Sequence, residues 1–184
     1  MCQFLSAIVL RNGDVLWHEA TDSHSDLVTH FGLPDSNPSC RHFAKVEFTP
    51  AHCDKKARHL YEEPASYVMR VDEATAPKWF AEVEGRVEKK LRSIIKAMIV
   101  DDKRPLILGG TRILVGGANV DTVKSARIVA MLGTSRVGEM LGTSRVGVMR
   151  ETSQVGVMLG TSRVGEMRET SQAPKTPTTD NRTK

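Results

Sequence analysis

Apolar residues recur at a fixed spacing of nine in the C-terminal part of the chain. The units run LGTSRVGEM (132–140), LGTSRVGVM (141–149), RETSQVGVM (150–158), LGTSRVGEM (159–167) and RETSQ (168–172). Repeats of this kind indicate a stacked architecture, in which each unit buries its apolar side against the next. Weaker copies begin near Ala126 and, one residue short, near Ala118. Three registers keep phase, with small residues at Ala118, Ala126, Ser135, Ser144, Ser153, Ser162 and Ser171, β-branched residues at Val120, Ile128, Val137, Val146, Val155 and Val164, and long apolar residues at Val123, Met131, Met140, Met149, Met158 and Met167.

The repeat predicts strands rather than a helix. Nine residues make about 2.5 helical turns, so successive units would face opposite sides of a helix, and the glycines would weaken it further. In an extended chain Ser-Arg-Val points in, out and in, and the glycine that follows permits a corner. RET recurs at Arg150 and Arg168, at twice the period of nine, so two units make one coil. We therefore expect a parallel β-solenoid with valine and methionine columns inside. A duplicated tail without order is the alternative.

The N-terminal part shows a different pattern, with alternating strands and one long amphipathic helix. Asn12-Gly13 is a hairpin signal between two apolar runs, and Ser23 is suited to cap a short helix. Apolar residues from Phe80 to Met98 keep helical spacing, which is typical of a helix lying on a sheet. The expected strands are residues 3–10, 15–17, 44–48 and 67–71, and the helices start at Ser23 and Pro77.

We therefore predict an α+β head domain over residues 1–104, a small parallel β-solenoid (β-helix) over 105–172 and a disordered tail over 173–184. The aromatic residues support this division, because all nine lie between Phe4 and Phe80 and the repeats contain none. The solenoid core must therefore be built from aliphatic side chains.

Composition narrows the classes of function. Residues 1–110 carry a net charge of −1 and residues 111–172 a net charge of +3, so charge alone does not demand nucleic acid. Apolar runs are too short for a membrane helix, and the N-terminus lacks a signal-peptide pattern. Three cysteines are too few for a disulfide framework and suggest a reducing, cytoplasmic setting.

The head motifs SAIVLRNGDVLWHEATDSHSDL and FAKVEFTP, followed by ILVGGANV, SARIVAM and serial SRVGEM units, resemble uncharacterised proteins of actinobacteria and their phages. In that family a compact α+β head precedes a variable run of short solenoid repeats. The family has no assigned activity, so no catalytic residue is transferred. The resemblance implies a phage or mobile-element accessory protein in the cytoplasm of the bacterial host. A likeness to pentapeptide-repeat proteins extends only to the idea of a repeat solenoid, because the period here is nine.

The outward repeat positions are the main candidate site. With two units in a coil, the arginines that stack on one side are Arg127, Arg145 and Arg163. On the other side Arg136 stacks with Gln154 and Gln172. Guanidinium groups about 4.8 Å apart repel one another unless acids intervene or an anion binds. The arginine stack predicts a docking face for an acidic protein or a phosphate backbone, and Glu139, Glu151, Glu166 and Glu169 are the acids expected to offset it.

The head offers weaker candidates. His24 with Asp22, Asp26 and Glu47 could supply acid–base chemistry, although Ser-His-Ser-Asp also fits an ordinary helix N-terminus. Cysteines and histidines gather at Cys40, His42, His52, Cys53 and His59, but without the spacing of a zinc site, so we expect no metal. No nucleotide-binding or hydrolase motif is present, and no catalytic residue or cofactor is expected.

We therefore expect a non-enzymatic interaction or scaffold protein that binds a host macromolecule through its rigid repeat surface. One alternative is an enzyme or small-ligand-binding head built on His24, with the solenoid as an oligomerisation module. Another is nucleic-acid binding through the arginine stack. The open solenoid end also predicts self-association into a homo-oligomer, through that end or through a side of the solenoid.

Overall fold

The computed structural model describes residues 5–34, 42–51, 64–72 and 76–174. The chain divides into two compact units, Met1–Lys96 and Ala97–Lys184, which we call the head and the solenoid. The sequence places this division at 104/105. In the structure it lies earlier, because two strands that precede residue 105 or span it already belong to the solenoid sheets.

The head is built on a four-stranded antiparallel sheet in the order β2-β1-β3-β4. The predicted hairpin at Asn12-Gly13 is confirmed, since Gly13 has a φ of 84° and its N–H donates to the carbonyl of Leu10. The elements are β1 (Leu5–Leu10), β2 (Val15–Leu16), β3 (Phe43–Pro50), the 3-10 turn η2 (Pro64–Ser66) and β4 (Tyr67–Val71).

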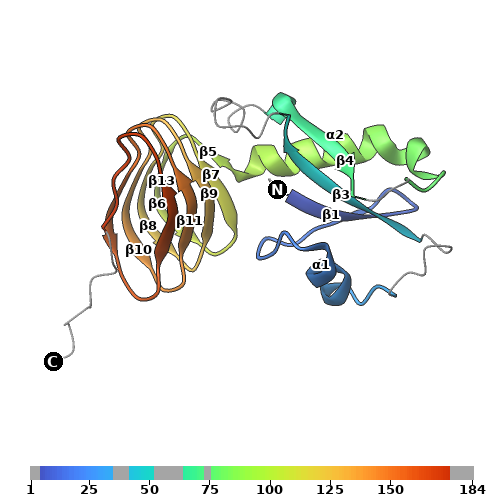
Figure 1. The fold of residues 1–184 in the computed structure, drawn as a ribbon, viewed down its shortest axis with the longest axis horizontal. Coiled ribbons are helices and arrows are strands. Elements are labelled where there is room, and N and C mark those ends of the chain that lie inside the picture. Colours follow the sequence, from blue (N-terminus) through green and yellow to red (C-terminus); the bar gives the residue numbers. More distant parts are fainter. Residues whose placement is uncertain (1–4, 35–41, 52–63, 73–75, 175–184) are drawn as a thin grey trace. The chain divides into compact units, whose positions relative to one another are not determined.

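Two helices cover opposite faces of this sheet (Figure 1). The short helix α1 (His24–His30) starts at the predicted cap Ser23, and its Leu27 packs with Ile8 and Phe43. The long helix α2 (Phe80–Met98) places the Arg92 guanidinium over the ring of Phe48. Phe43 and Phe48 are five residues apart on one strand, so their side chains point to opposite faces. The head is therefore an α+β unit with its core on both sides of the sheet.

The solenoid consists of two parallel sheets, seen in Figure 1 as stacked arrows. We call them the odd sheet, in the order β13-β11-β9-β7-β5, and the even sheet, in the order β12-β10-β8-β6. The chain alternates between them and makes about four turns. The strands are β5 (Ile99–Val100), β6 (Lys103–Leu108), β7 (Thr111–Leu114), β8 (Asn119–Lys124), β9 (Arg127–Met131), β10 (Arg136–Leu141), β11 (Arg145–Met149), β12 (Gln154–Met158) and β13 (Arg163–Met167).

The length of a coil follows from the strand register. Arg145 faces Arg163, a step of 18, whereas Arg136 faces Asn119, a step of 17. The predicted coil of 18 residues is therefore confirmed for the last coils. The coil that begins near Ala118 has 17 residues, one fewer, as the sequence predicted. Earlier coils are shorter still, because Thr111 faces Arg127 at a step of 16.

Aliphatic columns fill the solenoid core as predicted. The isoleucine, valine and methionine side chains of β8 to β12 that keep the repeat registers are buried in one continuous cluster. Met167 departs from the prediction, because 47% of it is exposed. It lies in the last described strand, so no further described coil covers it.

The position of the corners differs from the sequence interpretation. The chain turns at Leu-Gly-Thr, where Gly133, Gly142 and Gly160 have φ values of 66°, 65° and 72°. Gly138 and Gly147 instead lie inside strands. A Cβ added at either residue would approach a carbonyl oxygen of the preceding coil to 2.6 Å, so close backbone approach, rather than a corner, requires glycine there.

The solenoid contacts continue through the last partial repeat unit, residues 168–172. Gln172 bridges Gln154, and Ala173, one residue beyond the predicted end of the solenoid, packs partly against the solenoid core. Residues 175–184 lie outside the described part of the chain. Among the described residues, no helix combines the length and the apolar character needed to cross a membrane.

Candidate binding surface on the solenoid

The predicted arginine stack is present on the odd sheet. Arg127, Arg145 and Arg163 occupy the same register on β9, β11 and β13, which are adjacent parallel strands. Their Cα atoms are therefore separated by the strand spacing of about 4.8 Å. Arg145 and Arg163 are exposed, and Arg127 is half-buried. We call these three residues the arginine column.

The outer two guanidinium groups of the column face solvent. In the described structure neither Arg145 nor Arg163 forms a hydrogen bond or an ion pair through its side chain. Like charges at this spacing repel one another, although exposure to water and salt reduces the effect. Arg145 and Arg163 therefore present hydrogen-bond donors to solvent at a spacing that the backbone fixes.

The even sheet does not carry such a column. At the equivalent register Arg136 lies between Asn119 and Gln154, and its pairing with Gln154 is the one that the sequence predicted. The two faces of the same solenoid therefore differ in charge while sharing one backbone geometry. This difference provides an internal control for any role of the arginine column.

Two of the acids expected to offset the column instead bind the corner backbone. Glu151 and Glu169 take the positive-φ position that glycine takes in the LGT corners, with φ values of 58° and 60°. The Glu151 carboxylate accepts from the N–H of Gly133, and the Glu169 carboxylate accepts from the N–H of Glu151, at 2.6 Å in the latter case. These carboxylates tie each corner to the preceding coil.

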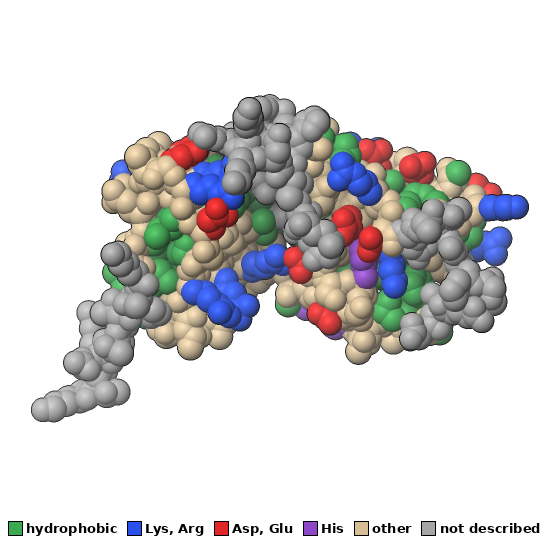
Figure 2. All heavy atoms as spheres, in the orientation of Figure 1, with side chains coloured by type: hydrophobic (Ala, Val, Ile, Leu, Met, Phe, Trp, Pro, Cys, Tyr) green, Lys and Arg blue, Asp and Glu red, His purple; other side chains and the backbone are tan. Residues whose placement is uncertain are grey.

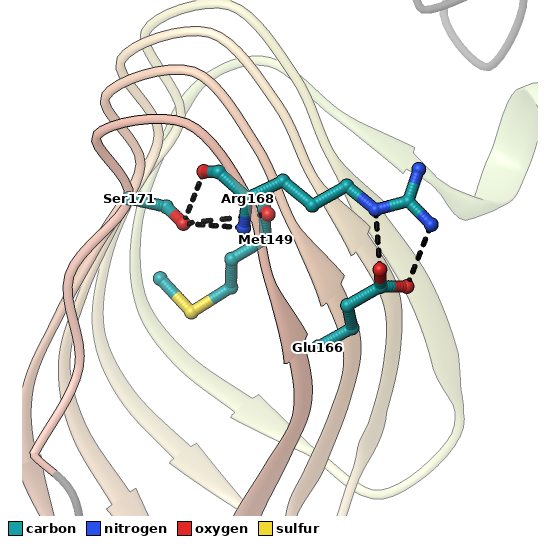
Figure 3. A network of polar contacts seen from close by, with 4 residues as sticks. All are labelled: Met149, Glu166, Arg168 and Ser171. Carbon is teal, nitrogen blue, oxygen red and sulfur yellow. Dashed lines mark hydrogen bonds and ion pairs between the residues drawn. The ribbon is translucent and has the colours of Figure 1, made fainter. Parts of the chain in front are cut away.

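A third acid is paired at the corner as well. Glu166 accepts two hydrogen bonds from the Arg168 guanidinium, from Nε at 2.5 Å and from Nη2 at 2.8 Å (Figure 3). In the same corner the Ser171 hydroxyl donates to the carbonyl of Arg168. Glu139, the remaining acid, lies on the even sheet. Figure 2 shows basic side chains in two groups on the visible solenoid face, with acidic side chains beside one of them.

The head places His24 in a different setting from the predicted acid–base cluster. His24 is buried, with Nδ1 lying 3.1 Å from the Asp72 carboxylate and Nε2 3.0 Å from the carbonyl oxygen of Val46. Sequence reasoning missed Asp72, because nothing local links it to a residue 48 positions earlier. With both ring nitrogens engaged, His24 fixes the start of α1 against β3 and the end of β4.

The predicted carboxylate neighbours of His24 have other contacts. Asp26 accepts a hydrogen bond from the hydroxyl of Thr21, and its backbone N–H donates to Ser23, which is the capping arrangement. The carbonyl of Asp22 accepts from the buried Ser6 hydroxyl. Glu47 is half-buried on β3. The described contacts of these residues serve the fold.

The cysteine and histidine cluster falls mostly outside the described residues. Cys40, His52, Cys53 and His59 are not described, and His42 is exposed next to the start of β3. Within the described residues, no group of three potential metal ligands is found.

No family model, curated protein or solved structure matches the chain. The fold itself defines a class, a β-solenoid repeat protein of about four turns preceded by an antiparallel sheet and helices. The case for function therefore rests on the residues that the repeat places at its surface.

Proposed function

We propose that this protein is a non-enzymatic binding protein whose solenoid docks an acidic segment of a partner macromolecule on the arginine column. The observation that supports this is the in-register placement of Arg127, Arg145 and Arg163 on adjacent strands, with the outer two guanidinium groups facing solvent. A planar guanidinium is suited to bidentate binding of a carboxylate. A rigid sheet fixes the backbone positions of these groups, so binding has to order only their side chains.

The geometry favours a protein over a nucleic acid as the partner. An extended acidic segment presents side chains on one face about every 6.8 Å, within reach of arginines whose Cα atoms lie about 4.8 Å apart. Three arginines span only about 10 Å, so they would neutralise few phosphates and give a shallow salt dependence. The net charge of +3 over residues 111–172 is also modest for a nucleic-acid surface.

The proposal is tested with a fluorescently labelled peptide of eight alternating glutamate and serine residues, in an anisotropy titration. We expect Arg145→Gln together with Arg163→Gln to weaken binding roughly tenfold or more, since hydrogen bonds to charged groups contribute about 1.5–3 kcal/mol each. The repeat already carries glutamine at the equivalent Gln154, so the substitution is compatible with the fold.

Arg136→Gln is the matched control, because it removes one arginine of the same repeat from the even sheet. Equal loss of binding in this control, or unchanged binding in the double variant, would contradict the proposal. A single-stranded oligonucleotide that binds more tightly than the peptide, with a steep salt dependence, would support the nucleic-acid alternative. His24→Ala is expected to leave peptide binding unchanged, because that residue belongs to the head.

Three finer statements stay predictions. The origin in an actinobacterium or one of its phages and the cytoplasmic location rest on the resemblance and on composition. Self-association through the last described coil rests on the exposure of Met167 on the edge strand β13. Light scattering on the purified full chain tests the last of these.

A further inference from the structure

Arg150 is a buried cation with no counter-ion among the residues that the structure describes. Only 7% of the residue is exposed, and its Nε has no hydrogen-bond partner in the described structure. The guanidinium also takes part in no ion pair there. Arginines are almost never this buried unless they are paired.

The repeat itself explains how Arg150 became buried. It follows β11 and has the register of Leu132 in the preceding coil and Arg168 in the next, because each of the three lies two repeat units from its neighbour. Their backbone N–H groups bond to Leu114, Met131 and Met149, respectively, one coil earlier. Leu132 is fully buried at this position, so the RET unit places a charged side chain where the LGT unit places an apolar one.

The next coil contains the counter-ion that Arg150 lacks. Arg168 is held by Glu166, two residues before it, through the two hydrogen bonds drawn in Figure 3. Two residues before Arg150 the chain has Val148, which faces Glu166 in the strand register. One substitution between otherwise equivalent units therefore separates a paired arginine from an unpaired one.

The other carboxylates of this corner are engaged elsewhere. Glu151 accepts from the Gly133 N–H and Glu169 from the Glu151 N–H. A guanidinium stays charged in proteins, and leaving a buried charge uncompensated is strongly destabilising. We therefore expect the Arg150 guanidinium to bind a hydrogen-bond acceptor from outside the chain.

We propose that Arg150 binds a small oxoanion, a carboxylate or phosphate group whose oxygen atoms accept hydrogen bonds from the guanidinium. The planar fork of arginine matches both groups and gives bidentate hydrogen bonds. This site is separate from the arginine column. Arg145 begins β11 and Arg150 follows its end, which places their Cα atoms about 16 Å apart along an extended strand.

The test is thermal unfolding of the full chain, followed by far-UV circular dichroism, with sodium phosphate or sodium acetate titrated against sodium chloride at matched ionic strength. We expect one of the two anions to raise the midpoint of the wild-type protein saturably, by about 4–8 °C. A response to phosphate alone identifies a phosphate group as the ligand, and a response to acetate identifies a carboxylate.

Arg150→Leu is the informative variant, because the repeat already places leucine at this register in Leu132. Without added anion it is expected to unfold at a higher temperature than the wild type, since it removes an unpaired buried charge, and to lose the anion response. Arg145→Gln, which alters the arginine column, is expected to keep the full response. The two proposals can therefore fail separately.

An equal anion response in Arg150→Leu would overturn the proposal. So would a wild-type protein that responds to neither anion. If the leucine variant does not fold, the Arg150 Nε–H resonance in a ¹⁵N NMR spectrum of the wild type takes its place. We expect that resonance to shift during the anion titration, and a resonance that does not move would overturn the proposal equally.

Discussion

The head and the solenoid satisfy their buried polar groups in different ways. In the head two buried side chains have partners far along the chain, since His24 meets Asp72 and the Val46 carbonyl, and the Ser6 hydroxyl donates to the Asp22 carbonyl. In the solenoid one contact recurs at three of the five serines of the repeat, whereas Ser162 donates to the Met140 carbonyl and the Ser135 hydroxyl has no hydrogen-bond partner among the described residues. The hydroxyls of Ser144, Ser153 and Ser171 donate to a carbonyl three residues earlier, at 2.6, 2.8 and 2.7 Å.

This difference determines what a substitution does. Each coil of the solenoid packs on the coils next to it. A substitution that disturbs one coil therefore also weakens its neighbours. A particular contact in the head has no equivalent elsewhere. Tryptophan fluorescence reports the head alone, because Trp17 and Trp79 lie there and residues 97–184 contain no aromatic residue, whereas far-UV circular dichroism reports both units.

The largest effect is expected from Met140→Ala. Met140 is fully buried in the solenoid core, and truncating such a side chain costs about 2–5 kcal/mol. The free energy of unfolding of the solenoid, obtained from the far-UV circular dichroism transition in denaturant, should fall by this amount. The tryptophan fluorescence transition should keep its midpoint. A parallel shift in fluorescence would instead show that the two units unfold as one.

Met167→Ala is the matched control for this prediction. It removes the same atoms from the same repeat register, but in a residue that is 47% exposed. The loss should be less than half that of Met140→Ala. Equal losses would mean that the last described coil is covered by something else, such as a second copy of the chain.

A smaller effect is expected from Gly147→Ala, with Gly85→Ala as its counterpart in the head. The added Cβ at Gly147 would lie 2.6 Å from the Val129 carbonyl oxygen, and overpacking of this kind costs about 1–3 kcal/mol. Gly85 lies in α2 with open space around the added Cβ, and alanine there should stabilise the helix by about 0.5–1 kcal/mol. Denaturant unfolding of both variants checks that the effects have opposite signs.

His24→Ala should destabilise the head by about 1–2 kcal/mol, because it removes two hydrogen-bonding contacts that no neighbour replaces. The fluorescence transition reports this loss. The part of the far-UV circular dichroism transition that belongs to the solenoid should keep its midpoint. Asp72→Asn keeps an oxygen acceptor beside His24. This variant is therefore expected to retain most of the wild-type free energy of unfolding, which an acid–base role for the pair would not predict.

The smallest effect concerns Asp102 at the start of the solenoid. A hydrogen bond from the Arg104 side chain lowers the pKa of the Asp102 carboxyl below its ordinary value of 3.8. Because the folded-state pKa is the lower one, the contribution to stability is present above the ordinary pKa and is lost as the pH falls through the folded value. Carboxyl ¹³C NMR titration should show this depression, and Arg104→Gln should remove it.

The sequence predicted the solenoid well because its information is periodic. The valine and methionine registers determine which side of each strand is buried, and the interval between Arg150 and Arg168 determines the coil length. The arginine column followed directly from that length. The strands of the head, the hairpin at Asn12-Gly13 and both helices were likewise predicted from local patterns, such as the cap at Ser23.

The remaining features depend on contacts that periodicity does not encode. Asp72 meets His24 only because β4 is placed beside β3 in the folded sheet. Glu151 follows Arg150 in a motif that appears solvent-exposed in the sequence, yet it turns with a positive φ and binds the backbone of the preceding coil. The burial of Arg150 is visible only once Leu132 is known to be its neighbour.

The bond from each RET glutamate to the corner before it makes the molecule extensible in whole coils. A second copy of residues 150–167 inserted after Met167 would add one more glutamate to the series that Glu151 and Glu169 begin, and it would place a fourth arginine over Arg163. It would also bury Met167 beneath a new methionine. Such a protein can therefore lengthen only by whole coils. A duplication of this kind would enlarge the outer face of the solenoid and leave the existing contacts unchanged.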